Sequence, residues 1–180
     1  MRKSTRTALS AALLPLALLA PVQAVEQAEA LPITKHVAVA GDEAQARPLI
    51  LAALRYAAFW NTGDEHYARA ALAADFTDRT LPKGRPQGLE GPLQASKGFR
   101  KAVPDLSAEV DDLVVAGDRV SVHLHFKGHF TGLFGEVQGK GQVVDFQAFD
   151  LYRIQDGRIA DNWHLEDNLT LMQQLGLVQN

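Results

Sequence analysis

The residues best suited to acid/base chemistry lie near the end of the chain, in segment 158–167. Apolar and polar residues alternate there, which is typical of a β-strand, and the alternation places Asp167 on the same face as Trp163 and Leu165. A carboxylate at the inward end of such a strand loses hydration, which raises its pKa and suits it to proton transfer near neutral pH. Asp167 is therefore a candidate catalytic residue, although it could equally be the N-cap of a helix that begins at Asn168.

A second candidate carboxylate lies in the strand predicted over residues 142–154. Asp150 occupies a position of the alternating pattern that is otherwise apolar. It is therefore either an inward polar group with a catalytic role or a sign that this face is only partly buried. Tyr152 could donate a hydrogen bond to the carbonyl of a ligand, or it could belong to the core. Phe146, on the same face, is predicted to line a ligand cavity.

A candidate metal site follows from His123 and His125, because a His-x-His strand presents both imidazoles on one face, as cupin metal sites do. The Glu and the Pro-x-Gly of a cupin are missing, however, and a helical first half does not fit an all-β jelly roll. We therefore predict no metal. The sequence also carries no Ser/His/Asp constellation, phosphate loop or dinucleotide fingerprint, so we predict no cofactor.

Helices are predicted before these strands. The spacing of the apolar residues favours three of them, over residues 46–60, 65–73 and 89–102. The first helix carries Tyr56 and Trp60, which, together with Trp163 of the last strand, are predicted to line or pack the same cavity as Phe146. Gly63 ends this helix, since glycine adopts the conformation that closes a helix at little cost.

After Pro104 the apolar period changes from helical to two, which indicates strands. The pattern predicts four long strands and a last helix, over residues 107–115, 120–127, 142–154, 158–167 and 168–177. Asp156 and Gly157 form a strong two-residue hairpin signal between the third and fourth strands. Helices followed by antiparallel strands define an α+β fold, in which helices cover one face of a curved sheet.

Several short phrases occur in order between residues 46 and 176 and together carry a resemblance. They are Phe59-Trp60-Asn61-Thr62-Gly63-Asp64, Ala74-Asp75-Phe76, Val103-Pro104-Asp105-Leu106, Gly117-Asp118-Arg119-Val120, Asp150-Leu151-Tyr152-Arg153-Ile154, Asp156-Gly157-Arg158-Ile159, Trp163 with Asp167, and Leu171-Met172-Gln173-Gln174-Leu175-Gly176. The ordered set resembles the SnoaL-like polyketide cyclases (ester cyclases) of the nuclear-transport-factor-2-like superfamily.

The resemblance implies a cone-shaped α+β barrel that encloses a deep apolar cavity, usually as a homodimer. In characterised members it implies a cofactor-free aldol ring closure of a polyketide ester, and the catalytic Asp of that reaction falls on Asp167. The loop 135–141 departs from the Pro-Pro-Thr-Gly-Lys phrase that is frequent in the family, so we expect a different cavity mouth. The superfamily also uses its cavity for isomerases, dehydratases and binding proteins, so the fold alone does not name a reaction.

The N-terminus has the organisation of a secretory signal peptide. Three cations within residues 2–6 precede the apolar run 8–22, and small residues allow cleavage after Ala24 or, more weakly, after Ala30. We therefore predict a signal peptide over residues 1–24, a mobile leader over 25–45 and one SnoaL-like domain over 46–180. The protein is expected in a bacterial periplasm or outside the cell. Cysteine is absent, which excludes disulfides, thiol catalysis and a lipid-anchored cysteine.

Charge and hydropathy restrict the partners. Cleavage after Ala24 removes three cations and no acid, so the formal charge falls from −3 to −6, which argues against a nucleic-acid partner. The apolar run of the signal is too short for a membrane span, so no membrane anchor is expected. His123, His125 and Lys127 alternate with apolar residues, and the resulting mixed surface favours a homodimer formed through the sheet.

Taken together, these observations predict an exported SnoaL-like protein whose cavity binds a small hydrophobic carbonyl compound. Asp167 would supply cofactor-free acid/base chemistry of the aldol cyclisation or isomerisation type. The alternative is a non-catalytic module that binds a small ligand in the same cavity. An assembly protein is a third class, and it would have a filled cavity and a large apolar outer surface.

Overall fold

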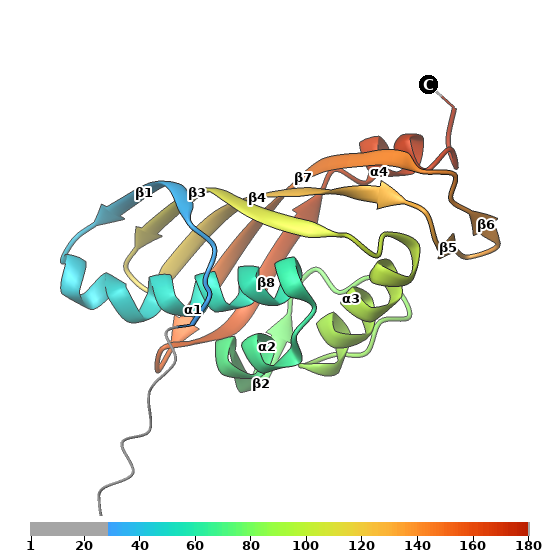
Figure 1. The fold of residues 1–180 in the computed structure, drawn as a ribbon. Helices are drawn as coiled ribbons and strands as arrows, with labels where there is room; N and C mark the ends of the chain where they lie inside the picture. The colour runs from blue at the N-terminus through green and yellow to red at the C-terminus, as the bar shows by residue number, and fades with distance from the viewer. Residues whose placement is uncertain (1–28, 180) are drawn as a thin grey trace, which may run out of the picture.

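A computed structural model describes residues 29–179 of the protein, and helices lie against one face of a curved sheet (Figure 1). The predicted signal peptide, residues 1–24, lies outside the described residues. The helices are α1 (Glu43–Thr62), α2 (Glu65–Ala71), α3 (Glu90–Ala102) and α4 (Asn168–Gln174). The strands are β1 (Thr34–Ala40), β2 (Leu72–Asp78), β3 (Ser107–Ala116), β4 (Arg119–Phe130), β5 (Leu133–Phe134), β6 (Val137–Gln138), β7 (Gln142–Gln155) and β8 (Arg158–Glu166).

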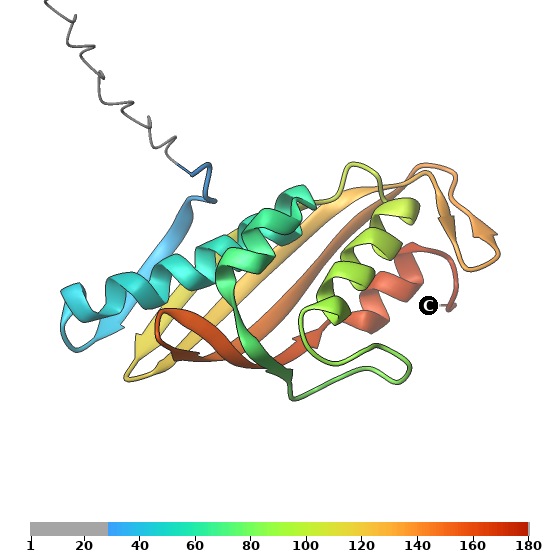
Figure 2. The ribbon, with the colours of Figure 1, turned by 90° about the horizontal axis from the view of Figure 1, so that it is seen from below.

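The main sheet has the strand order β1-β3-β4-β7-β8-β2. The four central strands follow one another as an antiparallel meander, whereas β1 and β2 pair in parallel with β3 and β8 at the two edges. The sheet curves without closing, and β5 and β6 form a separate small hairpin. Seen from below, α1 and α2 cover one part of the concave face and α3 covers another (Figure 2).

Helix α1 is defined by residues at both ends. Asp42 is the N-cap, and its carboxylate accepts a hydrogen bond of 2.9 Å from the backbone N–H of Gln45. Gly63 ends the helix in the left-handed conformation at φ 78°, which costs glycine little. The buried face of α1 consists largely of small residues, which lets the helix lie close to the sheet: Ala46, Ala52, Ala53, Ala57 and Ala58.

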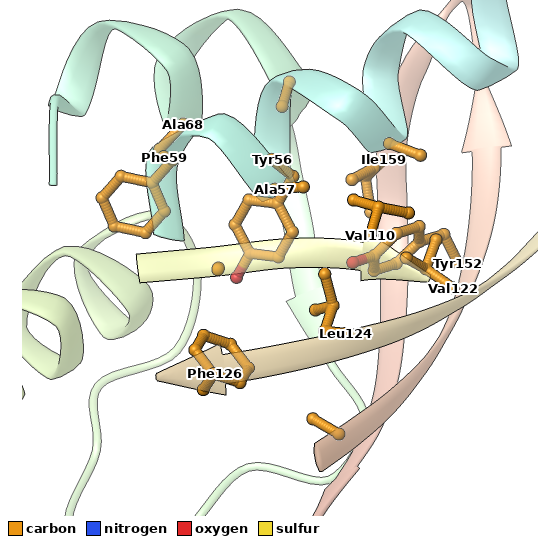
Figure 3. Close-up of a cluster of buried hydrophobic side chains, with 14 of the residues drawn as sticks. Tyr56, Ala57, Phe59, Ala68, Val110, Val122, Leu124, Phe126, Tyr152 and Ile159 are labelled. Atoms are coloured by element: carbon orange, nitrogen blue, oxygen red, sulfur yellow. The ribbon is translucent and has the colours of Figure 1, made fainter. Parts of the chain in front are cut away.

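The core lies between α1 and the concave face of the sheet. Tyr56 and Phe59 point from α1 towards β4, where Leu124 and Phe126 point back (Figure 3). The rings of Tyr56 and Tyr152 meet edge to face at 5.9 Å. Burial of an apolar side chain of this size contributes about 1.5–3 kcal/mol, so this layer holds the helix on the sheet.

The predicted α+β class is confirmed, and the predicted helices and four long strands are present. The leader expected over residues 25–45 differs in its second half, because Thr34–Ala40 form β1. Most side chains of this edge strand are exposed, so its sequence shows no apolar face. Strand β2 begins inside the helix expected over residues 65–73 and continues where no element was predicted. No local pattern indicates it, because its pairing with β8 joins residues far apart in the chain.

The outer face of the sheet, opposite α1, α2 and α3, is partly apolar. Phe149 and Leu165 are 54% and 74% exposed and lie side by side on β7 and β8. His123 of β4 stacks on Phe149 with ring centroids 4.3 Å apart. The histidines of β4 therefore lie on this outer face, opposite the apolar residues of the same strand, as predicted. No helix within residues 29–179 is long and apolar enough to span a membrane.

Candidate active site

A cavity of about 450 Å³ lies between α1, α3 and α4 and the concave face of the sheet. This volume is in the range of small-molecule sites. Its apolar lining includes Tyr56, Trp60, Pro92, Phe99, Leu124, Phe126, Phe134, Phe146, Leu171 and Met172. Its charged and amide lining consists of Asp78, Arg85, Gln94, Asp150, Asn162, His164, Glu166 and Asn168. The site is thus an apolar chamber with a group of ionisable side chains in one wall.

Aromatic rings form much of the apolar wall. Phe126 and Phe146 stack at 5.0 Å, and Trp60 and Phe99 meet these two rings edge to face at 6.2 and 6.0 Å. Such pairs hold each ring in a defined orientation. The wall can therefore bind an apolar or aromatic molecule of fixed shape.

Asp150 is the most unusual ionisable group of the cavity. It is 6% exposed, and its carboxylate accepts a hydrogen bond of 2.7 Å from the Tyr152 hydroxyl and a longer one of 3.5 Å from the Asn162 amide. Burial raises the pKa of Asp150 to about 6, although the hydrogen bond from Tyr152 and the positive charge of His164 oppose the rise. Asp150 is therefore a base near neutral pH and can hold a proton slightly below it.

His164 lies directly opposite Asp150 on the neighbouring strand β8. Its Nδ1 is 2.7 Å from Glu166, and its Nε2 is 3.1 and 3.2 Å from the two carboxylate oxygens of Asp78. Burial favours the neutral ring, but hydrogen bonds and charges from Glu166 and Asp78 outweigh it and raise the pKa of His164 to about 9. The imidazolium is thus a fixed positive charge whose two N–H groups are both occupied.

The end of β2 positions Asp78 in this wall. The backbone N–H of Asp78 donates to the side chain of Gln87 at 2.7 Å, and the Gln87 amide donates back to the Asp78 carbonyl at 2.9 Å. The N–H of Thr80 donates to the Asp78 carboxylate at 2.9 Å, while the Thr80 hydroxyl accepts from the N–H of His164 at 3.0 Å. These bonds connect the loop after β2 to β8 and fix Asp78 beside His164.

Most of the residues predicted for the cavity lie there. Tyr56, Trp60, Phe146 and Asp150 line it. Tyr152 is fully buried behind Asp150 and donates to it, so its hydroxyl serves the carboxylate rather than a ligand directly.

Asp167 and Trp163 lie outside the cavity, contrary to the expected geometry. Asp167 is exposed and caps α4, since its carboxylate accepts from the N–H and the hydroxyl of Thr170 at 3.1 and 2.7 Å. These hydrogen bonds lower its pKa, which is unsuited to a base near neutral pH. Trp163 lies on the outer face of the sheet, with the guanidinium of Arg119 5.5 Å from its ring centre. The concave face of β8 instead carries the residues of the other phase, Asn162, His164 and Glu166.

The histidines of β4 contact carboxylates on the outer face. The side-chain atoms of His125, Glu109 and Asp111 that could bind a metal ion lie within 4.8 Å of one another. Lys35 contacts Asp111 at 2.6 Å and Lys127 contacts Glu109 at 3.1 Å, so ammonium groups already neutralise both acids. The cluster is therefore a surface ion-pair network.

The curved sheet, the helices on its concave face and the enclosed acid/base wall define an α+β domain of the nuclear-transport-factor-2-like type. The chain belongs to the SnoaL-like polyketide cyclase family, whose sequence model matches residues 50–175. None of the curated proteins gives a significant match.

Solved structures agree with this assignment. A candidate polyketide cyclase of Bacillus cereus ATCC 10987 is 40% identical, with a TM-score of 0.76, over 84% of this chain and 97% of its own. TsrD of Streptomyces laurentii is 27% identical, with a TM-score of 0.67, over 77% of this chain and 100% of its own. IdmH, a candidate polyketide cyclase of Streptomyces antibioticus, is 28% identical, with a TM-score of 0.64, over 72% and 99%.

Proposed function

We propose that the protein is an exported, cofactor-free acid/base enzyme that acts on a small hydrophobic carbonyl compound in its cavity. Asp150 carries the proposal, because it is a buried carboxylate in an apolar chamber with its pKa raised to about 6. Such a group transfers protons efficiently near neutral pH, since its pKa lies close to the working pH. The aldol cyclisation or isomerisation type of reaction fits this chemistry.

The proposed step begins when Asp150 accepts a proton from a carbon next to a carbonyl group of the substrate. The C–H electron pair moves into the carbonyl, which becomes an enolate, and Asp150 becomes neutral. In a cyclisation the enolate carbon then bonds to a second carbonyl carbon, whose oxygen takes the proton back. In an isomerisation the proton returns to another carbon. His164 remains charged throughout and stabilises the negative charge that moves from Asp150 to the substrate.

The ionisable wall favours an enzyme over a binding module. A module that only binds an apolar ligand needs shape and burial, whereas desolvated carboxylates cost stability unless they are paired. Asp150 has hydrogen bonds but no direct cation, and it faces the cavity from a 6% exposed position. This arrangement disfavours simple binding and suits proton transfer.

Deuterium exchange tests the proposed proton transfer without the natural substrate. Ethyl α-methylbenzoylacetate is a suitable probe, because it is neutral and aromatic and has one acidic C–H between two carbonyls. In deuterium oxide the protein should accelerate the loss of this proton signal in NMR spectra above the buffer rate. An exchange rate equal to that of buffer across a panel of such probes would favour the binding module.

Export is part of the proposal, and the mature chain should begin at Val25. Cleavage there retains Glu29, whose carboxylate accepts hydrogen bonds of 2.8 Å from both the Nε and the Nη2 of Arg55. Cleavage after Ala30 would remove this paired contact. N-terminal sequencing of the protein from the periplasm or the medium gives the answer, and a chain that starts at Met1 in the cytoplasm would contradict export.

We also propose that the outer face of the sheet binds a second copy of the chain. Exposed Phe149 and Leu165 lie near its centre. Arg119 of β4 and Arg153 of β7 lie side by side at one end of this face. Lys127 and Asp145 lie side by side towards its other end. A two-fold axis through the apolar centre would place Phe149 and Leu165 of one copy against the same residues of its partner, as an isologous dimer requires.

Leu165→Arg should convert the dimer to a monomer at micromolar concentration. The side chain is 74% exposed, so the fold should survive, while the added charge would lie in the apolar centre of the interface. Light scattering should report about twice the mature mass for the unaltered protein and the single mass for the variant. Leu169→Arg, at a 63% exposed position of α4, is the matched control and should remain dimeric. An unaltered protein that is already monomeric would rule out the interface.

A further inference from the structure

An enolate oxygen in the cavity needs hydrogen-bond donors, and two of the donors beside Asp150, those of His164 and Tyr152, are already engaged. Both imidazole nitrogens of His164 contact carboxylates, of Glu166 on one side and Asp78 on the other. The Tyr152 hydroxyl donates to Asp150. These groups fix the charges of the wall but have no N–H or O–H left for a substrate oxygen.

Arg85 is the one arginine that lines the cavity, and within residues 29–179 no carboxylate or carbonyl group forms a hydrogen bond or ion pair with its guanidinium. This is unusual, since every other half-buried arginine of the described chain has such a partner. Those residues are Arg55 with Glu29, Arg100 with the carbonyls of Trp60 and Leu106, Arg119 with Asp118, and Arg153 with Asp161. A half-buried guanidinium without a partner keeps five N–H donors available.

The chain around Arg85 holds it in place. Its backbone N–H donates to the carbonyl of Pro82 at 3.1 Å, which closes a turn. Its stem lies against Gly91, where a Cβ would stand 3.5 Å from the Arg85 side chain and 2.5 Å from the carbonyl oxygen of Pro86. The glycine therefore lets this loop approach the start of α3 and aim the side chain into the cavity.

The positive charge of Arg85 also acts on residues of the acid/base wall. Its charge acts on the Tyr56 hydroxyl, as does the charge of Asp150, so the guanidinium and the candidate base are near the same part of the cavity. Arg85 also contributes to the lowered pKa of Glu166.

The charge balance identifies the kind of oxygen that Arg85 serves. With its carboxylates ionised and His164 protonated, the cavity lining carries one more negative than positive charge. A substrate carboxylate would add a second excess negative charge, whereas a neutral carbonyl adds none. When Asp150 takes a proton, its charge passes to the substrate and the total is unchanged.

The geometry points to Arg85 as a further catalytic residue, an inference that rests on the proposed function. Arg85 binds the substrate oxygen on which negative charge develops. The charge balance of the cavity selects a neutral carbonyl compound rather than a carboxylate. The interaction of Arg85 is weak with the neutral carbonyl and strong with the enolate, which is the condition for accelerating the reaction.

The test uses para-nitrophenol as an enolate-like probe, because its absorbance distinguishes phenolate from phenol. Asp150→Asn gives the cavity the charge that it has after proton transfer, so this variant should bind the phenolate and lower the pKa of the bound probe. Adding Arg85→Gln should weaken phenolate binding about tenfold or more, as expected for the loss of a hydrogen bond between charged groups. Arg85→Lys should restore part of the affinity.

Lys83→Gln in the same background is the matched control, because this cation of the same loop is exposed, and it should leave phenolate binding unchanged. Para-nitroanisole, which is neutral, should bind all these variants alike. Equal phenolate affinity with and without Arg85 would overturn the inference. Deuterium exchange keeps this outcome separate from the proposed function, since exchange that depends on Asp150 but not on Arg85 refutes only the role of Arg85.

Discussion

Replacing Asp150 with Asn should lower the rate of probe deuteration by about 10² to 10⁴-fold, the usual contribution of a positioned general base. The amide oxygen can still accept the hydrogen bond from Tyr152, and the cost of burying a charge disappears, so the variant should be no less stable above pH 6. In the unaltered protein the rate should rise with pH as Asp150 loses its proton at about 6. The variant should lose this rise.

Asp167→Asn is the matched control for this substitution. It also converts a carboxylate to an amide, but at an exposed position outside the cavity, and its oxygen can still cap α4. Probe deuteration should therefore proceed at the unaltered rate. If Asp167→Asn slowed the reaction and Asp150→Asn did not, Asp167 rather than Asp150 would be the base.

The sequence was informative wherever a strand had one clearly apolar face. Strand β4 places Val120, Val122, Leu124 and Phe126 on the core side, and its alternation is undisturbed along the strand. The same parity in β7 identified Asp150 as a polar group on an inward face. Regular alternation therefore sufficed to single out Asp150 as a candidate residue of the cavity.

For β8, the sequence did not indicate which of the two alternating sets of residues faces the cavity. Trp163 and Leu165 suggest an inward face, but they belong to the outer surface of the sheet, which is itself partly apolar. Asp161 of β8 is buried, with Arg79 and Arg153 paired to its carboxylate, so burial there does not follow hydrophobicity. A strand with apolar residues on one face and charged groups in a cavity on the other has no reliable hydrophobic phase.

The position of Asp78 in the cavity wall could not be predicted from the sequence either. Asp78 comes from β2, 86 positions before its partner His164 in the chain, and the two meet only because β2 joins the sheet edge in parallel with β8. No local pattern connects residues at that separation. The sequence did carry one indication: His164 and Glu166 lie two positions apart in β8 and therefore share a face. That face could have been predicted to be an ionisable wall of the cavity.

His164 links the site to the stability of the fold. Its pKa is raised from 6.5 to about 9 in the folded protein, so folding is favoured by protonation of the ring. For a pKa raised by folding, this stabilisation is complete below pH 6.5 and is lost as the pH rises through about 9. The lowered pKa of Glu166 reflects the same contact from the other partner and is not counted again.

The free energy of unfolding should therefore fall by roughly 3 kcal/mol between pH 6.5 and pH 9, because a tenfold change in proton affinity corresponds to about 1.4 kcal/mol. Urea unfolding at pH steps across this window measures it. His164→Gln should remove the fall, whereas His36→Gln, at an exposed position of β1, should retain it. A flat curve for the unaltered protein would contradict the charged state of His164, and this measurement stands even if His164→Gln fails to fold.

The same substitution should change catalysis through Asp150. The positive charge of His164 lowers the pKa of Asp150, so its removal should move the rise in probe deuteration to a pH above about 6. The maximum rate should also fall, because the enolate loses a nearby cation. A residue with a purely structural role would change stability and leave the midpoint of this pH profile in place. The shift therefore distinguishes an electrostatic part of the active site from a buried ion pair that only holds β2 against β8.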